Sequence, residues 1–320
     1  MTPQPSNSFK QFDYSLRPSK QVERKIMVEV LLRLGGVGFD ISDYKYLGFG
    51  SPYYVDFVMF HKYLFIRKMI CVEWGDVARR MRFNKPFKFI RLKLGPLSKH
   101  IPAIRQTEKF FIWLDYDRSL DQTMLLDIDG VAGRLAPGSI FVVTVDARPK
   151  LPKDFESEDL PVKQRELQTL RTYKEWFSSY LERQPTGESV SRAHVANTFY
   201  EVITERIRQT LVQTGSGLRF FQVFNYFYQD GAPMLTLGGI IGTEADESRV
   251  QGFSHRFVRT GKDYLTISVP PLTLREKQWI DRRLDDELTT KKLSFELDDD
   301  PLKNYIKFYK EYPTYLETLL

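Results

Sequence analysis

The sequence predicts an α/β fold with a mostly parallel β-sheet, a terminal antiparallel hairpin, an N-terminal helix and a C-terminal extension. Three observations support this prediction. Apolar runs alternate with helical patterns over residues 44–145, as in βαβ crossovers. Two longer helical patterns follow. Two further apolar runs then flank a short loop that contains Asp230-Gly231, which is a hairpin signal.

The elements are expected in the following order. Apolar residues recur at helical spacing over residues 21–34, and Gly35-Gly36 closes this first helix. The expected parallel strands are 44–47, 69–74, 87–94, 110–116 and 140–145. The expected helices between them are 53–65, 76–83 and 119–135. Longer helices are expected over 164–181 and 192–213, and the hairpin strands over 218–228 and 234–241.

The pattern weakens after Gly242. A strand over residues 264–269 and a helix over 273–288 are expected there, followed by acidic residues and an aromatic tail. We therefore divide the chain into two parts. Residues 1–243 form the N-terminal helix and the α/β domain, and residues 244–320 form a C-terminal extension packed on it.

The composition is ordinary for a globular protein, with 42% hydrophobic and 28% charged residues. No stretch approaches the roughly 18 apolar residues of a membrane span, and the N-terminus lacks an apolar signal core. We therefore expect a cytoplasmic protein with no membrane partner. The single cysteine, Cys71, lies in an apolar run and is expected in the core. The 4 histidines lie far apart, so no metal site is expected.

Positive charge is concentrated in one stretch. Residues 61–109 carry 13 Lys and Arg against 3 acidic residues, whereas the whole chain has a net charge of +6. This asymmetry favours a polyanionic partner or a phosphate-bearing ligand. The alternative is a set of solvated faces on several elements, where the charges need not converge.

The first candidate site is a strand that runs into a Gly-x-Gly turn and then a helix. It consists of Tyr46, Gly48, Phe49, Gly50 and Ser51, with one leucine between the first two. Glycine lets the backbone approach a ligand closely, and the following helix offers free N–H groups. These residues are predicted to bind a cofactor, although a Gly-x-Gly turn alone is common in loops.

A carboxylate follows at the end of the second expected strand. Glu73 lies 25 residues after Gly48, close to the roughly 20-residue gap of the nucleotide-binding fingerprint. Its carboxylate can accept hydrogen bonds from both ribose hydroxyls, and Trp74 beside it is included in the predicted cofactor site. The alternative is that Glu73 pairs with Arg79 or Arg80 on the next helix.

The strand over residues 110–116 delivers polar residues to its carboxyl end, where open α/β sheets bind ligands. Asp115 or Asp117 is a candidate general base, and Tyr116 could stack on the substrate or hydrogen-bond to it. Asp115 is the preferred catalytic candidate and could also contact the cofactor. The alternative for Asp117 is that it caps the following helix.

A basic cluster occupies the start of the first helix. Lys20 and Arg24 stand at i and i+4, and Arg17 precedes them. These three residues are predicted to bind a substrate phosphate. The alternatives are a solvated helix start or a salt bridge with Asp13 or Glu23.

Five segments together resemble a known family. They are, in order, Tyr14–Lys20, Tyr46–Ser51, Val72-Glu73, Arg82–Phe87 and Trp113–Asp117. Over about residues 14–145 they are similar to a prokaryotic family described as "putative O-methyltransferases". The resemblance implies a Rossmann-like class I methyltransferase fold, whose sheet also ends in a hairpin, with S-adenosylmethionine as cofactor. It further suggests a link to phage defence.

One departure from the class I pattern bears on function. These enzymes usually place Asp or Glu two residues before the first glycine, to meet the amino group of the cofactor, and here Tyr46 stands there. Either Asp56 or Asp115 replaces that acid, or cofactor binding is weak or lost. The loop at residues 93–96, where adenine contacts usually follow, contains no acid, so recognition there would use backbone and apolar contacts.

Two functions follow from these observations. The first is an S-adenosylmethionine-dependent methyltransferase acting on an oxygen or nitrogen nucleophile, with RNA or DNA as the expected phosphate-bearing substrate. The second is a catalytically inactive Rossmann-like module that holds a nucleotide or nucleic acid for a partner protein. Tyr46 in place of the acid favours the second, and fold alone does not decide between them.

Overall fold

The computed structural model describes residues 17–151, 161–284 and 288–313. Eight strands form one sheet in this part of the chain. The strands are β1 (Lys45–Phe49), β2 (Lys68–Glu73), β3 (Ile90–Leu94), β4 (Phe110–Ser119), β5 (Ser139–Asp146), β6 (Arg219–Asp230), β7 (Ala232–Gly242) and β8 (Leu265–Ile267). The larger helices are α1 (Pro18–Leu34), α2 (Val55–Leu64), α3 (Ala78–Asn84), α4 (Gln122–Ala132), α5 (Val162–Phe177) and α6 (Val195–Gln213).

The sheet has the strand order β3-β2-β1-β4-β5-β7-β6-β8. Strands β1 to β5 pair in parallel, whereas β7 is antiparallel to both β5 and β6. This arrangement confirms the predicted Rossmann-like methyltransferase sheet with its terminal hairpin. The short strand β8 adds a parallel edge beside β6.

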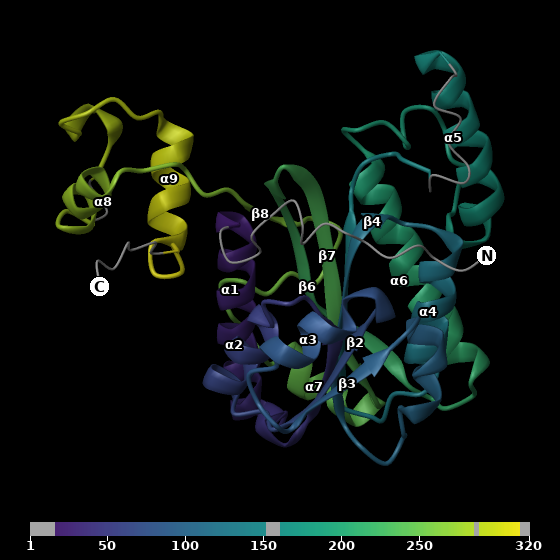
Figure 1. Ribbon diagram of the computed structural model, residues 1–320. Coiled ribbons are helices and arrows are strands. Elements are labelled where there is room, and N and C mark those ends of the chain that lie inside the picture. The colour runs from purple at the N-terminus through teal and green to yellow at the C-terminus, as the bar shows by residue number, and fades with distance from the viewer. Residues whose placement is uncertain (1–16, 152–160, 285–287, 314–320) are drawn as a thin grey trace.

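Helices cover the sheet in two layers, as Figure 1 shows. Side chains of α1, α2 and α3 join one core cluster, and those of α4, α5 and α6 join the other. Because side chains alternate along a strand, Phe111 and Trp113 of β4 face the first layer, while Ile112 and Leu114 face the second. Strand β5 is buried at every position, as expected for a strand covered on both faces.

The hairpin turns more tightly than the sequence predicted. We expected a loop over residues 229–233, but pairing between β6 and β7 continues to Asp230 opposite Ala232. Gly231 alone makes the turn, at φ +96°, in the left-handed region that glycine adopts without a steric penalty.

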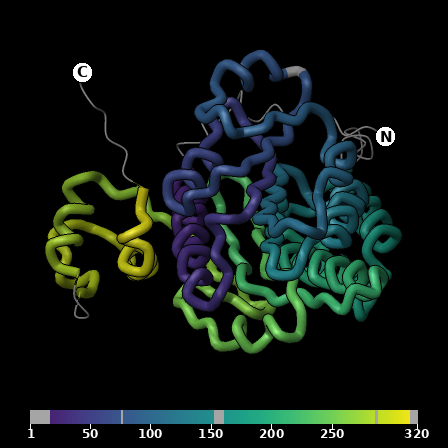
Figure 2. The backbone as a smooth tube through the Cα atoms, turned by 90° about the horizontal axis from the view of Figure 1, so that it is seen from below, coloured from purple at the N-terminus to yellow at the C-terminus, as the bar shows by residue number. Residues whose placement is uncertain are grey.

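Residues 274–284 and 288–313 form a small helical group beside α1, set apart from the sheet in Figures 1 and 2. It contains α8 (Leu274–Asp281) and α9 (Asp299–Phe308), which share a cluster around Ile280, Leu302 and Tyr305. An ion pair of 2.8 Å between Arg256 and Glu311 connects the group to the preceding loop. The division of the chain at residue 243 stays a prediction.

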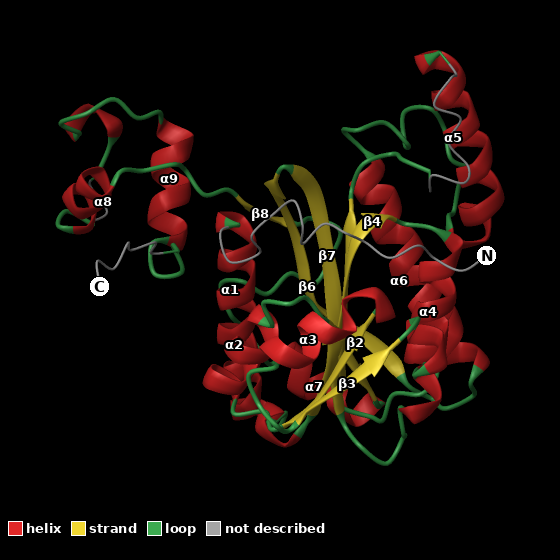
Figure 3. Cartoon of the chain, viewed as in Figure 1, coloured by secondary structure: helices red, strands yellow, loops and turns green. Residues whose placement is uncertain are grey.

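Helix α7 (Glu244–Gln251), drawn in red at the lower end of the sheet in Figure 3, was not expected. Its sequence lacks apolar periodicity, but Thr243 and Asp246 form a reciprocal capping box at its start. Among the described residues, no helix is long and apolar enough to cross a membrane. In the same residues, no three or more His, Cys, Asp or Glu side chains are grouped to hold a metal ion.

Candidate functional site

The candidate site lies at the carboxyl ends of β1, β2 and β4. Strand β1 pairs with β2 on one side and with β4 on the other, so the strand order reverses at the junction of β1 and β4. Open α/β sheets bind ligands at this kind of switch point. Gly48 of β1 lies opposite Cys71 of β2 and Trp113 of β4, which places the predicted glycine turn and Asp115 at the same edge.

The two glycines of the turn are required by packing inside the protein. A Cβ atom at Gly48 would lie 2.2 Å from Oη of Tyr46, and one at Gly50 would lie 2.3 Å from Sγ of Cys71. Real Cβ atoms do not approach other atoms so closely, so neither position accepts a side chain without rearrangement.

The ring of Tyr46 fills the core below Gly48. Its centroid lies 4.9–5.2 Å from the ring centroids of Phe57, Phe60 and Phe111, and the residue is buried. Burial, together with the charges of Asp56 and Asp115, holds the pKa of Tyr46 well above its usual value. The residue in place of the usual acid is therefore a neutral core tyrosine, and its predicted contact with a cofactor stays untested.

Glu73 ends β2 with a partly exposed side chain. Its Oε1 accepts a hydrogen bond of 2.8 Å from the backbone N–H of Trp74, which is itself half-buried. The other predicted residues of the turn, Phe49 and Ser51, are also half-buried. The structure thus brings Glu73, which was predicted to bind the ribose, and the glycine turn to the same edge of the sheet.

Asp115 is held by a lysine of α1. Lys20 Nζ lies 2.7 Å from Oδ1 of Asp115 and 2.8 Å from Oε2 of Glu23. The Lys20 side chain is fully buried, whereas that of Asp115 is 23% exposed. The ammonium also lies 4.2 Å from the ring centroid of Trp113, in cation–π contact. Asp115 therefore presents a paired but accessible carboxylate at the edge of the sheet.

A second ion pair lies beside the first. Arg24 Nε is 2.5 Å from Oδ1 of Asp56, near the start of α2, and the Asp56 side chain is 16% exposed. Although burial opposes the charged form, Asp56 raises the pKa of Arg24 above its usual value. Both acids that could replace the missing carboxylate of β1 are thus paired with cations of α1.

A chain of buried hydrogen bonds connects these groups to the sheet. Trp113 Nε1 donates to Oγ1 of Thr144 at 2.9 Å, and Oγ1 of Thr144 lies 2.7 Å from Oγ1 of Thr236. The Thr236 hydroxyl in turn donates to Glu23. Burial raises the pKa of Glu23, an effect that Lys20 opposes. Thr236 was not identified from the sequence, because only the folded sheet brings it next to α1.

The start of α1 is fixed from the far end of β6. The carboxylate of Asp230 accepts hydrogen bonds from the backbone N–H groups of Ser19 at 3.1 Å and Lys20 at 2.8 Å. These donors have no partner within the helix, so Asp230 acts as a cap supplied by another element. Arg17, the third residue of the predicted basic cluster, is half-buried at this end.

The solvated helix start, one of the alternatives for this cluster, does not describe Lys20 and Arg24. The structure places both side chains in the interior. Of the acids that pair with them, only Glu23 was named from the sequence, as an alternative to a substrate phosphate. The other alternative partner, Asp13, lies outside the described residues. The assignment of Arg17, Lys20 and Arg24 to substrate phosphate stays an untested prediction.

Tyr116 faces the opposite side of β4. Its hydroxyl donates to Oδ2 of Asp127 on α4 at 2.9 Å, and its ring meets Phe49 edge-on at 5.0 Å. Burial, and after it the charge of Asp127, holds the pKa of Tyr116 well above its usual value. Burial also raises the pKa of Asp127, to about 6. Asp127 was not identified from the sequence, where it lies within an ordinary helical pattern.

Asp117 is exposed two residues beyond Asp115, in a stretch where the register between β4 and β5 shifts. The suggestion that it caps the next helix is wrong. Strand β4 continues to Ser119, and Asp121 caps α4 by accepting the backbone N–H of Met124 at 2.9 Å.

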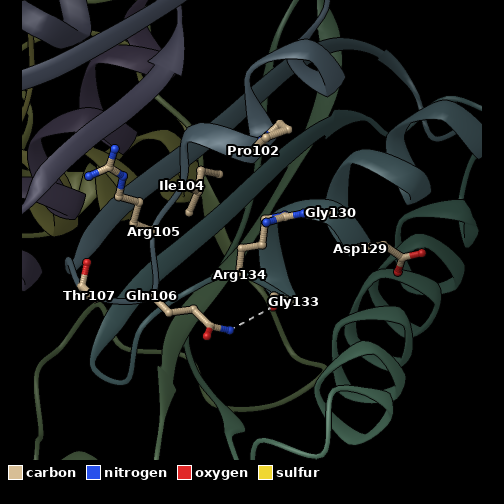
Figure 4. A pocket seen from close by; sticks show the side chains of 9 residues that line it. All are labelled: Pro102, Ile104, Arg105, Gln106, Thr107, Asp129, Gly130, Gly133 and Arg134. Atoms are coloured by element: carbon tan, nitrogen blue, oxygen red, sulfur yellow. Dashed lines mark hydrogen bonds between the residues drawn. The ribbon is translucent and has the colours of Figure 1, made fainter.

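A cavity of about 810 Å³ lies at the opposite edge of the sheet, near the amino end of β4 (Figure 4). Loop residues and the C-terminal part of α4 line it. They are Pro102, Ile104, Arg105, Gln106, Thr107, Asp129, Gly130, Gly133 and Arg134. The lining residues precede β4 or lie at the end of α4, whereas Asp115 lies farther along β4 toward the other edge of the sheet. This cavity therefore does not belong to the candidate site.

Comparison with known proteins gives a family match over almost the whole chain. The family model described as "Putative O-methyltransferase" matches residues 12–320. No curated protein matches the sequence significantly.

Three solved structures are among those that the comparison with this chain found. Trm1 from Pyrococcus horikoshii, in complex with S-adenosyl-L-methionine, has a TM-score of 0.48 and 13% identity, over 78% of this chain and 61% of that chain. An O-methyltransferase from Bacillus cereus in complex with SAH has a TM-score of 0.39 and 11% identity, over 73% and 86%. An O-methyltransferase family protein from Burkholderia thailandensis has a TM-score of 0.33 and 10% identity, over 69% and 56%. The chain thus covers less than two thirds of the Pyrococcus and Burkholderia proteins.

Proposed function

The chain belongs to the "Putative O-methyltransferase" family, and from this premise we propose that it transfers a methyl group from S-adenosylmethionine to an oxygen or nitrogen nucleophile. One observation carries the proposal. The glycine turn of β1, Glu73 of β2 and Asp115 of β4 meet at one edge of the sheet, across the point where the strand order reverses.

We assign the cofactor to this edge. The partly exposed carboxylate of Glu73 would accept the ribose hydroxyls, as in other nucleotide-binding sheets. The backbone of Gly48 to Ser51 would face the methionyl part, because this turn follows β1 at the edge where the strand order reverses. Asp115 would meet the cofactor's ammonium group in place of the acid missing at Tyr46, because its carboxylate is more exposed than that of Asp56.

The chemistry requires little beyond alignment. When bound, S-adenosylmethionine supplies an activated methyl carbon, which the nucleophile attacks while the bond to sulfur breaks. The proton of the nucleophile must go to a base, and we assign this role to Asp117, which is exposed two residues after Asp115 along β4. The Tyr116 hydroxyl already donates to Asp127, so we assign Tyr116 to a supporting position.

A transfer assay with labelled methyl groups tests this proposal. Wild type, Asp115→Asn, Asp117→Asn and the remote exposed Asp43→Asn would be compared on pools of RNA, DNA, protein and small metabolites. We expect a labelled product with wild type and Asp43→Asn, and a rate at least about tenfold lower with each site variant. Product formation that is unaffected by both site variants would refute the assigned roles.

The inactive binding module remains the second candidate, because β1 carries a buried tyrosine where class I enzymes carry an acid. This alternative predicts that cofactor binds but that no pool receives a methyl group. The cytoplasmic location and the link to phage defence stay expectations from the sequence and the resemblance.

A further inference from the structure

The two faces of β3 differ in what they present. Leu92 pairs in register with Cys71 and packs toward α3, whereas Arg91 and Lys93 pair with Ile70 and Val72. Neighbours in register share a face, and Ile70 and Val72 belong to the cluster on the side of α4. Arg91 and Lys93 therefore point to the face opposite α3.

That face is open at this end of the sheet. Between β3 and β4 the chain forms the short turns η6 (Leu97–Lys99) and η7 (Ile101–Ala103) in place of a regular helix. Lys68, Arg91 and Lys93 are exposed, and Ile70 between them is only half-buried. Strand β3 is also the edge strand, because it pairs with β2 alone in the sheet.

A fourth cation extends the surface toward the amino end of β4. Arg105 is exposed, and its charge and that of Lys68 both act on Glu108. Glu108 itself forms an ion pair with Lys45, and the hydrogen bond from Lys45 lowers the pKa of that carboxyl. The acid on which these two cations act is thus already paired with a different lysine.

We propose that Lys68, Arg91, Lys93 and Arg105, here called the basic face, form a docking surface for the phosphate backbone of a nucleic acid. Cations two residues apart on a strand stand roughly 7 Å from one another, so β3 offers a row of charges. Such charge, with only a half-buried Ile70 and a buried Val72 opposite the cations of β3, suits a hydrated polyanion better than an apolar protein partner.

The basic face also lies next to the edge of the sheet to which we assign the cofactor. Lys93 lies one residue before Leu94, which pairs with Glu73 at the proposed ribose site. A nucleic acid along β3 could therefore extend to the carboxyl edge of the sheet. In this respect the inference rests on the proposed function, because it treats the docked strand as the carrier of the methyl acceptor. The burial of Lys20 and Arg24 favours this surface over the N-terminal helix.

The salt dependence of binding tests the inference. Retention of labelled mixed-sequence RNA and DNA, single- and double-stranded, would be measured from low to physiological salt. The basic-face variant replaces Lys68, Arg91, Lys93 and Arg105 with Gln. The matched control replaces four exposed basic residues of α5 with Gln, namely Lys163, Arg165, Arg171 and Lys174. Calorimetry with S-adenosylmethionine on both variants reports the state of the cofactor site separately.

We expect wild type to bind with an affinity that falls steeply with salt, because neutralised phosphates release counterions. In the basic-face variant the slope should fall by about one for each cation that contacts a phosphate, while the α5 variant behaves as wild type. No binding by wild type at low salt, or equal losses in both variants, would overturn the inference. If the basic-face variant misfolds, the single variant Arg91→Glu replaces it and must weaken binding. Cofactor binding without nucleic-acid binding would overturn the basic face alone and leave the proposed methyl transfer standing.

Discussion

Lys20 Nζ lies 2.7 Å from Oδ1 of Asp115, which connects the first turn of α1 to β4 just beyond the pairing of β4 with β1. The same ammonium is 2.8 Å from Glu23, so one buried cation serves two carboxylates. Removing one partner of a buried ion pair leaves an uncompensated charge in the interior. The N-terminal helix is therefore part of the site's structure as well as of its covering layer.

We predict that Lys20→Met lowers the free energy of unfolding by about 3–5 kcal/mol, because Glu23 and Asp115 lose their shared partner. Denaturant unfolding measures this difference. The exposed Lys163→Met is the matched control and should change stability by less than about 0.5 kcal/mol. Equal stabilities of the two variants would show that the buried pair contributes nothing.

Gly50→Ala should lower the free energy of unfolding by about 1–3 kcal/mol, because the new Cβ would lie 2.3 Å from Sγ of Cys71. Adding Cys71→Ala removes that sulfur and should recover part of the loss. Gly36→Ala is the control, since a Cβ there meets no atom within 4 Å. If Cys71→Ala recovers nothing, the collision with Cys71 is not the reason for the glycine.

Asp127 should make stability depend on pH. Burial raises its pKa to about 6, so the folded protein holds this proton more tightly than the unfolded chain. Its contribution to the free energy of unfolding is therefore full at low pH and falls by up to about 3 kcal/mol as pH rises from about 4 to about 6. Unfolding of wild type and Asp127→Asn across this range should show that the variant lacks the fall.

Tyr116→Phe tests the same pair from the other side. The Tyr116 hydroxyl lowers the pKa of Asp127 by donating to its carboxylate, so its removal should extend the fall in stability to higher pH. A pH dependence identical to that of wild type in both variants would exclude Asp127 as its source.

Asp121→Ala should destabilise the protein by about 1 kcal/mol, because α4 loses the acceptor for the N–H of Met124. Gln122→Ala, at the exposed next position, is the control. Denaturant unfolding of both variants measures the difference in their free energies of unfolding, and equal values would contradict the assigned cap.

The sheet was predictable because its strands are continuous apolar runs separated by helical patterns. Strand β5, buried at all its positions, is the plainest case. Helix α7 was missed because a capping box, rather than an apolar stripe, starts it. The end of β4 was placed too early because its last residues are polar and the strand continues to Ser119.

The edge that holds the candidate site was also predictable, since strand ends and the spacing from Gly48 to Glu73 are local features of the sequence. The pairings across that edge were not. Helical spacing found Lys20 and Arg24, but their partners Asp115 and Asp56 lie 95 and 32 residues away along the chain. Helical periodicity shows which residues lie on the same face of one helix. It does not show which residues of the sheet that face contacts, because those contacts form only when the helix packs on the sheet.

The most direct measurement of the central claim is calorimetric titration of S-adenosylmethionine and S-adenosylhomocysteine into wild type, Glu73→Ala and the control Glu175→Ala on the exposed face of α5. We predict that wild type and Glu175→Ala bind both ligands. Glu73→Ala should bind them at least about tenfold more weakly, because hydrogen bonds to a charged carboxylate are lost. Absence of binding to wild type at millimolar ligand, or unchanged affinity of Glu73→Ala, would contradict the cofactor site described above.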